Sequence, residues 1–238
     1  MQIIAHRGNS SVCHENTMAA FERAVADGAD GIEFDLRLTA DRQWVIHHDA
    51  ELELDGKRQA ISALPLHETL RARVGPQREP IPRLDDFLLW ARETRIPLVF
   101  DIKDRDGIRE LVETIERAGI ENPAIYSSFH RSVLKALELA RPDWPRGLIV
   151  GDPRSALARQ FLTGSLIRWA RRHRLTSLHL DEHWVVPSTL AKMREAGLRL
   201  AIWTVDDPLR MTLLAALEID ALITNRPDLA RITLRGNS

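Results

Sequence analysis

Two histidines near the N-terminus each accompany a short apolar segment. His6 comes directly after residues 3–5, and His48 ends the segment 44–48. Imidazole exchanges protons readily near neutral pH, so two such side chains can serve as a general acid and a general base. The sequence therefore contains a candidate pair for acid–base catalysis.

Carboxylates occupy alternating positions in two further apolar runs. Glu33 and Asp35 are two residues apart, and Asp101 and Lys103 repeat that spacing. Side chains of a strand alternate between its faces, so each pair shares a face. Carboxylates at close range repel one another and need a cation, and oxygen ligands favour Mg²⁺ or Ca²⁺. With Arg7 and Lys103 as fixed positive charges for an anionic group, this chemistry suits phosphodiester hydrolysis.

These residues need a fold that brings distant strand ends together. Apolar runs rich in β-branched residues alternate with helical patterns along the chain. The predicted strands are 3–5, 31–34, 97–102, 124–126, 147–150, 177–180, 198–203 and 221–224. The predicted helices are 17–26, 84–93, 107–118, 132–140, 166–172, 188–196 and 208–217. Strands that are apolar on both faces indicate a parallel sheet covered by helices, and eight of them predict an α/β fold of the (β/α)₈ TIM-type barrel class rather than an open doubly wound sheet.

One part of the chain interrupts this alternation. Residues 44–48 follow the second strand after too few residues for a helix, which predicts a hairpin return. Residues 51–82 contain several prolines and glycines, and we expect an irregular excursion that could act as a substrate-facing lid. No linker rich in Gly or Ser divides the chain, so residues 1–238 are predicted to form a single barrel domain. The candidate residues would meet at the carboxyl ends of its strands.

Composition excludes several classes of protein. The chain has 33 basic and 34 acidic side chains and a net charge of −1, so no nucleic-acid partner is expected. A charged fraction of 28% spread along the chain, with ample Leu, Ile and Val, argues against disorder, and no apolar stretch is long enough for stable membrane insertion. The single cysteine, Cys13, excludes intrachain disulfides and a Cys-rich zinc site. The first residues lack the apolar pattern of a targeting segment, so a cytoplasmic location is expected.

The chain resembles the glycerophosphodiester phosphodiesterase family in a series of motifs that occur in order. They are AHRG at 5–8, ENT at 15–17, GADGIEFD at 28–35, HD at 48–49, IPRL at 81–84, SF at 128–129, WTV at 203–205 and ITNRPD at 223–228. The resemblance implies a (β/α)₈ barrel that splits glycerophosphodiesters into glycerol 3-phosphate and an alcohol with the help of a divalent cation. The implied partner is therefore a small-molecule glycerophosphodiester.

The resemblance also implies a role for each candidate residue. His6 and His48 match the general acid and base, and Glu33, Asp35 and Asp101 match the ligands of Mg²⁺ or Ca²⁺. The residues implied to bind the phosphate or another part of the substrate are Arg7, Lys103, Glu15 and Trp203.

The chain departs from the family pattern at several positions. Asp101 stands where a longer Glu is usual, which predicts weaker or displaced metal binding, and Asn225 stands where an Asp is common. An Arg-Thr-Thr element is absent from the excursion, and Glu51, Glu53 and Asp55 place negative charge there instead. This charge predicts a preference for substrates with a cationic or neutral head group.

Three other functions stay open at this point. A barrel aldolase or isomerase would use Lys103 as a Schiff-base amine, which three nearby carboxylates disfavour because they stabilise the ammonium form. A second possibility is a non-catalytic barrel that only binds phosphodiesters. A third is hydrolysis of a different phosphodiester, such as a lysophospholipid.

His179, Asp181 and His183 alternate along a later strand and are expected at the barrel mouth.

Overall fold

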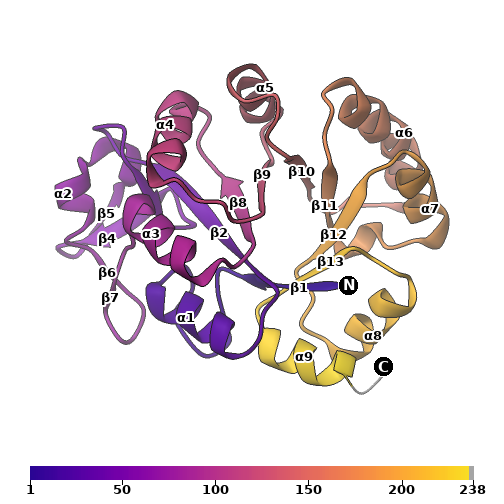
Figure 1. Ribbon diagram of the computed structural model, residues 1–238, viewed down its shortest axis with the longest axis horizontal. Coiled ribbons are helices and arrows are strands. Elements are labelled where there is room, and N and C mark those ends of the chain that lie inside the picture. Colours follow the sequence, from indigo (N-terminus) through magenta and orange to yellow (C-terminus); the bar gives the residue numbers. More distant parts are fainter. Residues whose placement is uncertain (236–238) are drawn as a thin grey trace.

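The computed structural model describes residues 1–235, in which eight parallel strands close into a barrel surrounded by helices (Figure 1). The barrel strands are β1 (Gln2–His6), β2 (Gly31–Leu38), β8 (Leu98–Ile102), β9 (Ala124–Ser128), β10 (Arg146–Val150), β11 (Ser177–Asp181), β12 (Arg199–Trp203) and β13 (Ala221–Thr224). Strand β1 pairs in parallel with both β13 and β2, which closes the barrel. The predicted (β/α)₈ TIM-type barrel is confirmed.

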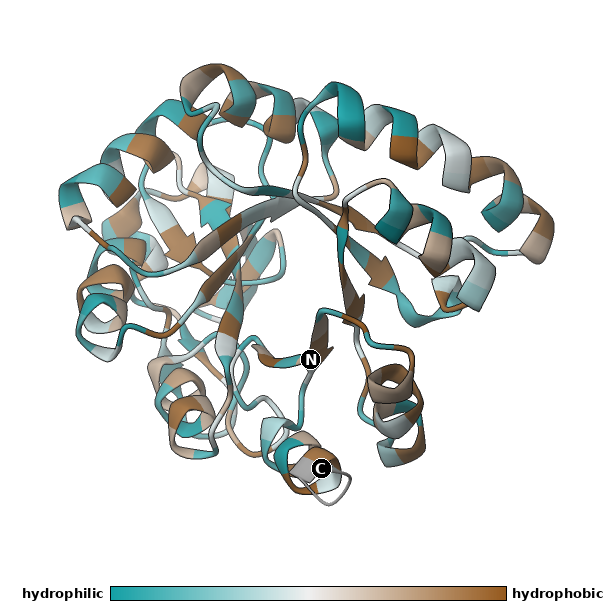
Figure 2. Cartoon of the chain, turned by 45° about the vertical axis from the view of Figure 1, so that its right-hand side comes forward, coloured by the Kyte–Doolittle hydropathy of each residue, from teal (hydrophilic) through white to brown (hydrophobic). Residues whose placement is uncertain are grey.

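Helices that follow the strands cover the outside of the barrel (Figure 2). They are α1 (Met18–Ala26), α3 (Leu84–Thr94), α4 (Ile108–Ala118), α5 (Arg131–Ala140), α6 (Ala156–Arg172), α7 (Pro187–Glu195), α8 (Pro208–Ala216) and α9 (Pro227–Arg235). Helix α6 begins well before the predicted 166–172 because Ser155 caps it by accepting a hydrogen bond from the Ala158 backbone N–H. Exposed Leu157 and Phe161 obscured its apolar periodicity in the sequence. Helix α9 was not predicted.

The barrel interior contains an apolar layer below a polar one. The apolar layer consists of Ile4, Val99, Ala201, Ala221 and Ile223. Because every second residue of a strand points inward, the next inward positions toward the carboxyl ends of β1 and β8 are His6 and Asp101. The apolar layer thus closes the floor beneath the polar side chains.

The predicted excursion after the second strand is present, but residues 51–82 consist of short regular elements instead of irregular chain. Strand β3 (Trp44–Ile46) returns antiparallel to β2, as predicted. It is followed by the hairpin β4 (Glu51–Leu54) and β5 (Lys57–Ala60), the turn η1 (Ile61–Ala63), the short helix α2 (Leu66–Thr69), and the pair β6 (Arg73–Val74) and β7 (Glu79–Pro80). These elements share a small apolar cluster made of Val45, Leu52, Leu54, Ile61, Leu64, Ala72 and Ile81. Alternating exposed acids and buried leucines in β4 were the period-two signal of this hairpin.

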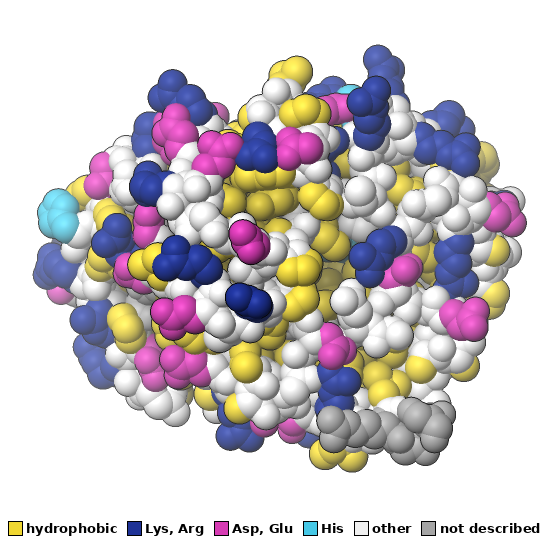
Figure 3. Space-filling view, viewed as in Figure 1, with side chains coloured by type: hydrophobic (Ala, Val, Ile, Leu, Met, Phe, Trp, Pro, Cys, Tyr) yellow, Lys and Arg dark blue, Asp and Glu magenta, His cyan; other side chains and the backbone are white. Residues whose placement is uncertain are grey.

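The surface carries charges of both signs. In the view of Figure 3, Lys and Arg side chains lie among Asp and Glu side chains with no field of a single sign, in agreement with the net charge of −1. Within residues 1–235, the structure contains no helix with the length and apolar character needed to cross a membrane.

Candidate active site

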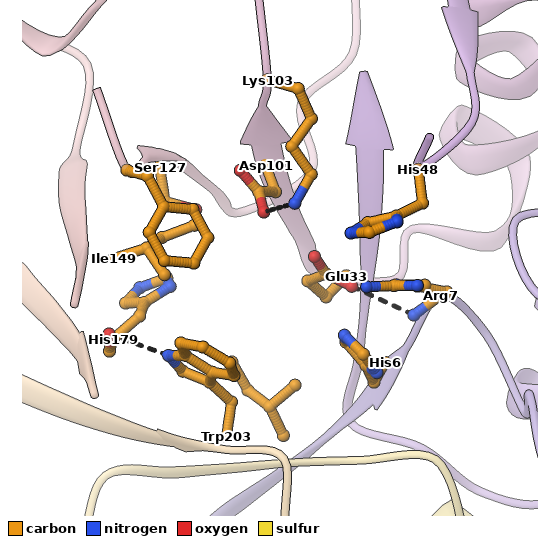
Figure 4. Close-up of a pocket in the computed structure, with 12 residues that line it drawn as sticks. His6, Arg7, Glu33, His48, Asp101, Lys103, Ser127, Ile149, His179 and Trp203 are labelled. Carbon is orange, nitrogen blue, oxygen red and sulfur yellow. Dashed lines mark hydrogen bonds and ion pairs between the residues drawn. The ribbon is translucent and has the colours of Figure 1, made fainter. Parts of the chain in front are cut away.

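A cavity of about 100 Å³ opens at the carboxyl ends of the barrel strands (Figure 4). Its lining residues are His6, Arg7, Glu33, His48, Asp101, Lys103, Ser127, Phe129, Ile149, His179, Trp203 and Ile223. Seven of the nine residues singled out from the sequence are among them. The other two, Asp35 and Glu15, contact Arg7, whose Nε lies 3.0 Å from Asp35 Oδ2 and whose Nη1 lies 2.7 Å from Glu15 Oε1.

A sharp turn after β1 positions Arg7. Arg7 and Gly8 both have positive φ angles, of 58° and 85°. A Cβ atom on Gly8 would lie 2.6 Å from the carbonyl carbon of Ala20, so the turn accepts only glycine there. The turn also directs the Arg7 backbone N–H to Glu33 Oε2 at 3.0 Å. The turn at residues 6–8 thus positions the Arg7 guanidinium and also contacts the Glu33 carboxylate through the backbone.

The carboxylates of Glu33, Asp35 and Asp101 form a buried cluster. Asp35 and Asp101 are register partners on β2 and β8, and ligand oxygens of all three residues lie within 4.8 Å of one another. Burial and the neighbouring Asp35 raise the pKa of Glu33 well above its usual range, and burial raises the pKa of Asp101 to about 6. Burial acts on Asp35 in the same direction, but Lys103 and Arg7 outweigh it and hold the pKa of Asp35 at about 2. The cluster therefore needs more positive charge than these side chains supply.

The donor set of this cluster fits a divalent cation. Its three carboxylates are hard oxygen ligands of the kind that Mg²⁺ and Ca²⁺ prefer. Asp101 Oδ1 is buried and accepts no hydrogen bond from the described residues, while Asp101 Oδ2 accepts one from Lys103. An oxygen with unused lone pairs beside two other carboxylates is the arrangement that a cation would satisfy.

The two histidines reach the cavity from opposite sides of Arg7 and Glu33 in the view of Figure 4. The Nδ1 atom of His6 lies 2.7 Å from Asn225 Oδ1, and burial, with help from Arg7, lowers the pKa of His6 to about 4. The Nδ1 atom of His48 lies 2.9 Å from Asp49 Oδ1. The His6 imidazole is therefore half-buried and neutral at physiological pH, and the His48 imidazole pairs with a carboxylate.

Sequence reasoning missed residues that orient this site. Asn16 donates from Nδ2 to Asp35 Oδ2 at 2.7 Å and accepts from the Asp35 backbone N–H at 3.2 Å. Arg37 donates to the backbone carbonyl of His48 at 2.6 Å. Asn16 lies in the ENT motif at 15–17 directly before a helix, whose N-cap is Thr17. No local pattern indicates the Arg37 contact.

The expected group of mouth residues is only partly brought together. His179 is buried inside the barrel and lines the cavity. Asp181 and His183 lie at the exposed rim, with Asp181 Oδ1 2.6 Å from His183 Nδ1, and Asp152 completes a cluster with them. Alternation along the strand placed His179 inward, whereas His183 lies beyond the end of β11 in the turn η2 (Glu182–Trp184).

Comparison with known proteins identifies the family. The model of the glycerophosphoryl diester phosphodiesterase family matches residues 6–229. The chain belongs to this family. It is accordingly a phosphoric diester hydrolase of the family that hydrolyses glycerophosphodiesters.

Relatives from several bacteria share the sequence or the fold. A glycerophosphodiester phosphodiesterase of Caldanaerobacter subterraneus subsp. tengcongensis is 29% identical, and the match covers 95% of this chain and 94% of that protein. The crystal structure of a glycerophosphodiester phosphodiesterase from Parabacteroides distasonis is 25% identical with a TM-score of 0.82, covering 99% of this chain and 97% of that one. A phosphodiesterase of Oleispira antarctica, solved in complex with the product sn-glycerol-3-phosphate, is 23% identical with a TM-score of 0.87 and the same coverage.

Proposed function

We propose that this family member hydrolyses glycerophosphodiesters to glycerol 3-phosphate and an alcohol, with His6 and His48 transferring protons and a divalent cation, Mg²⁺ or Ca²⁺, as cofactor. The observation that carries the proposal is the single cavity that both imidazoles share with carboxylates and basic side chains. The product bound to the Oleispira antarctica relative supports the choice of substrate class.

The two imidazoles match the proton transfers that the reaction needs. Hydrolysis forms a bond between phosphorus and the oxygen of water and breaks the bond between phosphorus and the alcohol oxygen. The attacking water loses a proton and the departing alcohol gains one, so a base and an acid are both required. Each transfer contributes roughly 10²–10⁴-fold to the rate. His6 and His48 line the cavity, and we assign these roles to them; His179 also lines it, but its Nε2 lies 3.1 Å from Ser177 Oγ.

Arg7 and Lys103 provide the positive charge for the substrate phosphate. Both line the cavity, and Arg7 is fixed by ion pairs with Asp35 and Glu15. A guanidinium held in this way presents its remaining N–H groups without further loss of side-chain freedom. We assign Glu15 the task of orienting Arg7, with the phosphate bound between Arg7 and Lys103.

Glu33, Asp35 and Asp101 would hold the cation. When bound, a divalent cation neutralises such a carboxylate cluster and polarises a phosphoryl oxygen. Asp101 Oδ1, buried without a hydrogen-bond donor among residues 1–235, supports this assignment. The choice of Mg²⁺ or Ca²⁺ rests on the all-oxygen donor set.

Two aromatic side chains form the opposite wall. Phe129 and Trp203 meet edge to face with ring centroids 5.7 Å apart. Trp203 Nε1 donates to the His179 backbone carbonyl at 3.0 Å, which fixes the indole. We propose that this wall packs against the carbon skeleton of the substrate.

An assay of glycerol 3-phosphate release from glycerophosphocholine tests the proposal. Product should form with Mg²⁺ or Ca²⁺, disappear in excess EDTA, and return when the cation is restored. Full activity in EDTA, with no metal found by elemental analysis, would refute the cofactor. Binding of a glycerophosphodiester by calorimetry without product formation, over a panel of head groups, would favour the non-catalytic barrel instead.

A further inference from the structure

Asn225 lies between the half-buried imidazole of His6 and the carboxylate of Asp206, which does not line the catalytic cavity. Asp206 Oδ2 accepts from Asn225 Nδ2 at 2.7 Å. Asp206 Oδ1 accepts from the Asn225 backbone N–H and from Thr224 Oγ1, each at 2.8 Å. On the other side, Asn225 Oδ1 lies 2.7 Å from His6 Nδ1 and accepts from Ser10 Oγ at 2.9 Å. The hydrogen-bonded series Asp206–Asn225–His6 connects the loop after β12 to the end of β1.

The donors and acceptors of these three side chains determine the orientation of the Asn225 amide and the tautomer of His6. An ionised carboxylate only accepts, so the Asn225 amide must turn its NH₂ group toward Asp206 and its carbonyl oxygen toward His6. An acceptor 2.7 Å from His6 Nδ1 requires a hydrogen on Nδ1. A neutral imidazole carries a single N–H, so the lone pair lies on Nε2, the ring nitrogen left for the cavity that His6 lines.

We propose that Asp206 and Asn225 are positioning residues that hold His6 as its Nδ1–H tautomer, which makes His6 the general base and His48 the general acid. The tautomer follows from the hydrogen bonds alone, whereas its catalytic consequence rests on the proposed function. Proton transfer then has one direction: water gives a proton to His6 Nε2, and the departing alcohol oxygen takes one from His48. His48 suits the second role because its partner is the Asp49 carboxylate, whose negative charge complements the imidazolium that a general acid must be, whereas His6 pairs with a neutral amide.

The substitution Asp206→Asn tests the chain at a residue that does not touch His6. The new amide must keep its oxygen toward the Asn225 backbone N–H, because that group can only donate. Its NH₂ group then faces the NH₂ group of Asn225, which has to rotate and present a donor to His6 Nδ1. His6 should change to its Nε2–H tautomer and lose the lone pair on the cavity side.

A double variant reverses the effect and a neighbouring one controls for charge. In Asp206→Asn combined with Asn225→Asp, the amide at 206 donates to a carboxylate at 225, which again accepts from His6 Nδ1–H. The matched control is Asp207→Asn, which removes the same charge at the adjacent position. Asp207 caps α8 by accepting from the Arg210 backbone N–H at 2.9 Å, and Asn caps helices equally well.

Two-bond ¹H–¹⁵N spectra of the metal-free protein labelled at histidine distinguish the two tautomers, with His6 identified by its absence in His6→Gln. We expect the Nδ1–H pattern in the wild type, in Asp207→Asn and in the double variant, and the Nε2–H pattern in Asp206→Asn. The kcat of Asp206→Asn should fall roughly 10²–10⁴-fold at nearly constant KM and recover in the double variant. An Nε2–H pattern in the wild type overturns the inference even if no variant folds.

The remaining outcomes separate the inference from the proposed function. If Asp206→Asn changes the tautomer but retains the wild-type kcat, His6 is not the base. If the wild type hydrolyses glycerophosphodiesters while His6 is the Nε2–H tautomer, the proposed function stands and the positioning chain is refuted. If the tautomers behave as expected but the wild type releases no glycerol 3-phosphate, the proposed function and the assignment of the base are both overturned.

Discussion

The ammonium of Lys103 lies 2.8 Å from Asp35 Oδ1, within the cluster that we assign to a metal ion. Lys103 also donates a hydrogen bond to Asp101, and these two carboxylates raise its pKa despite its burial. Even so, the pKa of Glu33 stays well above its usual range. One ammonium and the Arg7 guanidinium therefore leave three buried carboxylates short of positive charge, so a divalent cation should stabilise the folded chain.

Adding Mg²⁺ or Ca²⁺ should raise the melting temperature of the metal-free protein. A ligand present at 100 times its Kd stabilises the folded state by about 2.7 kcal/mol. For a chain of this length that corresponds to a rise of roughly 5–10 °C. Thermal unfolding in EDTA and then with each cation measures the rise in melting temperature. The substitutions Glu33→Gln and Asp101→Asn should each abolish it.

The exposed cluster of Asp152, Asp181 and His183 supplies the control. Its ligand atoms are also within 4.8 Å of one another, but Asp152 and His183 are exposed. Asp152→Asn should therefore keep the full rise. A rise that disappears in Asp152→Asn and survives in Glu33→Gln would place the cation at the rim instead.

Substrates with different leaving groups should separate the roles of the two histidines. If His48 protonates the departing alcohol, His48→Ala should lower kcat on glycerophosphocholine by roughly 10²–10⁴. The loss should be far smaller on a p-nitrophenyl diester, because p-nitrophenolate departs without a proton. His6→Ala should impair both substrates, and the double variant should cost little more than the worse single one. Equal losses on both substrates in His48→Ala would contradict the assignment.

The stability of the protein at acidic pH should depend on His179. This ring is fully buried with Nε2 3.1 Å from Ser177 Oγ, and burial lowers its pKa to about 4. Below about pH 6.5 His179 binds a proton in the unfolded chain but not in the folded chain. The free energy of unfolding therefore decreases as pH falls from 6.5 toward 4. Between pH 7 and pH 5 this amounts to roughly 2 kcal/mol.

Comparing His179→Asn with the wild type isolates this contribution. Burial raises the pKa values of Glu33 and Asp101, which therefore act in the opposite direction in both proteins and cancel in the comparison. Urea denaturation at pH 7 and pH 5 should give a smaller difference in unfolding free energy for His179→Asn, by about 2 kcal/mol. The same pH dependence in both proteins would mean that His179 takes up protons as easily in the folded state.

The barrel and the core of the site could be predicted because both follow short-range patterns. Strands buried on both faces are apolar runs, as in residues 98–100, and helices fill most of the intervals between them. Period-two alternation places Glu33 and Asp35 on one face whatever the rest of the chain does. In barrels of this class the active site lies at the carboxyl ends of the strands, which predicts that the remaining candidates meet at that end.

Contacts between distant segments left no trace in the sequence. His6 and Asn225 are 219 residues apart, and only the closure of β1 against β13 brings them together. Asn225 could be noted as a departure from a common Asp, but its amide orientation depends on Asp206, which no motif predicts to be its partner. In the same way, Asn16 reads as a helix-start residue until Asp35 is placed beside it.

The acidic residues of the β4–β5 hairpin do not form the negative rim that the sequence suggested. Glu51 Oε2 lies 3.2 Å from Arg58 Nε, and Asp55 Oδ2 lies 2.8 Å from Arg71 Nη2. None of the three acids lines the catalytic cavity. All three acids are exposed and outside the cavity, where salt screens their charge, so they should have little influence on the choice of head group.

Replacing Glu51, Glu53 and Asp55 together by the corresponding amides should therefore leave substrate preference unchanged. The ratio of kcat/KM for glycerophosphocholine to that for glycerophosphoglycerol measures this preference at low and at physiological salt. Phe129→Leu is the comparison variant, because Phe129 lines the cavity beside Trp203. An aromatic face attracts a quaternary ammonium by about 0.5–1 kcal/mol, so losing it should lower the ratio by roughly 2–5-fold. If the triple variant lowers the ratio at low salt and Phe129→Leu does not, the hairpin selects the head group after all.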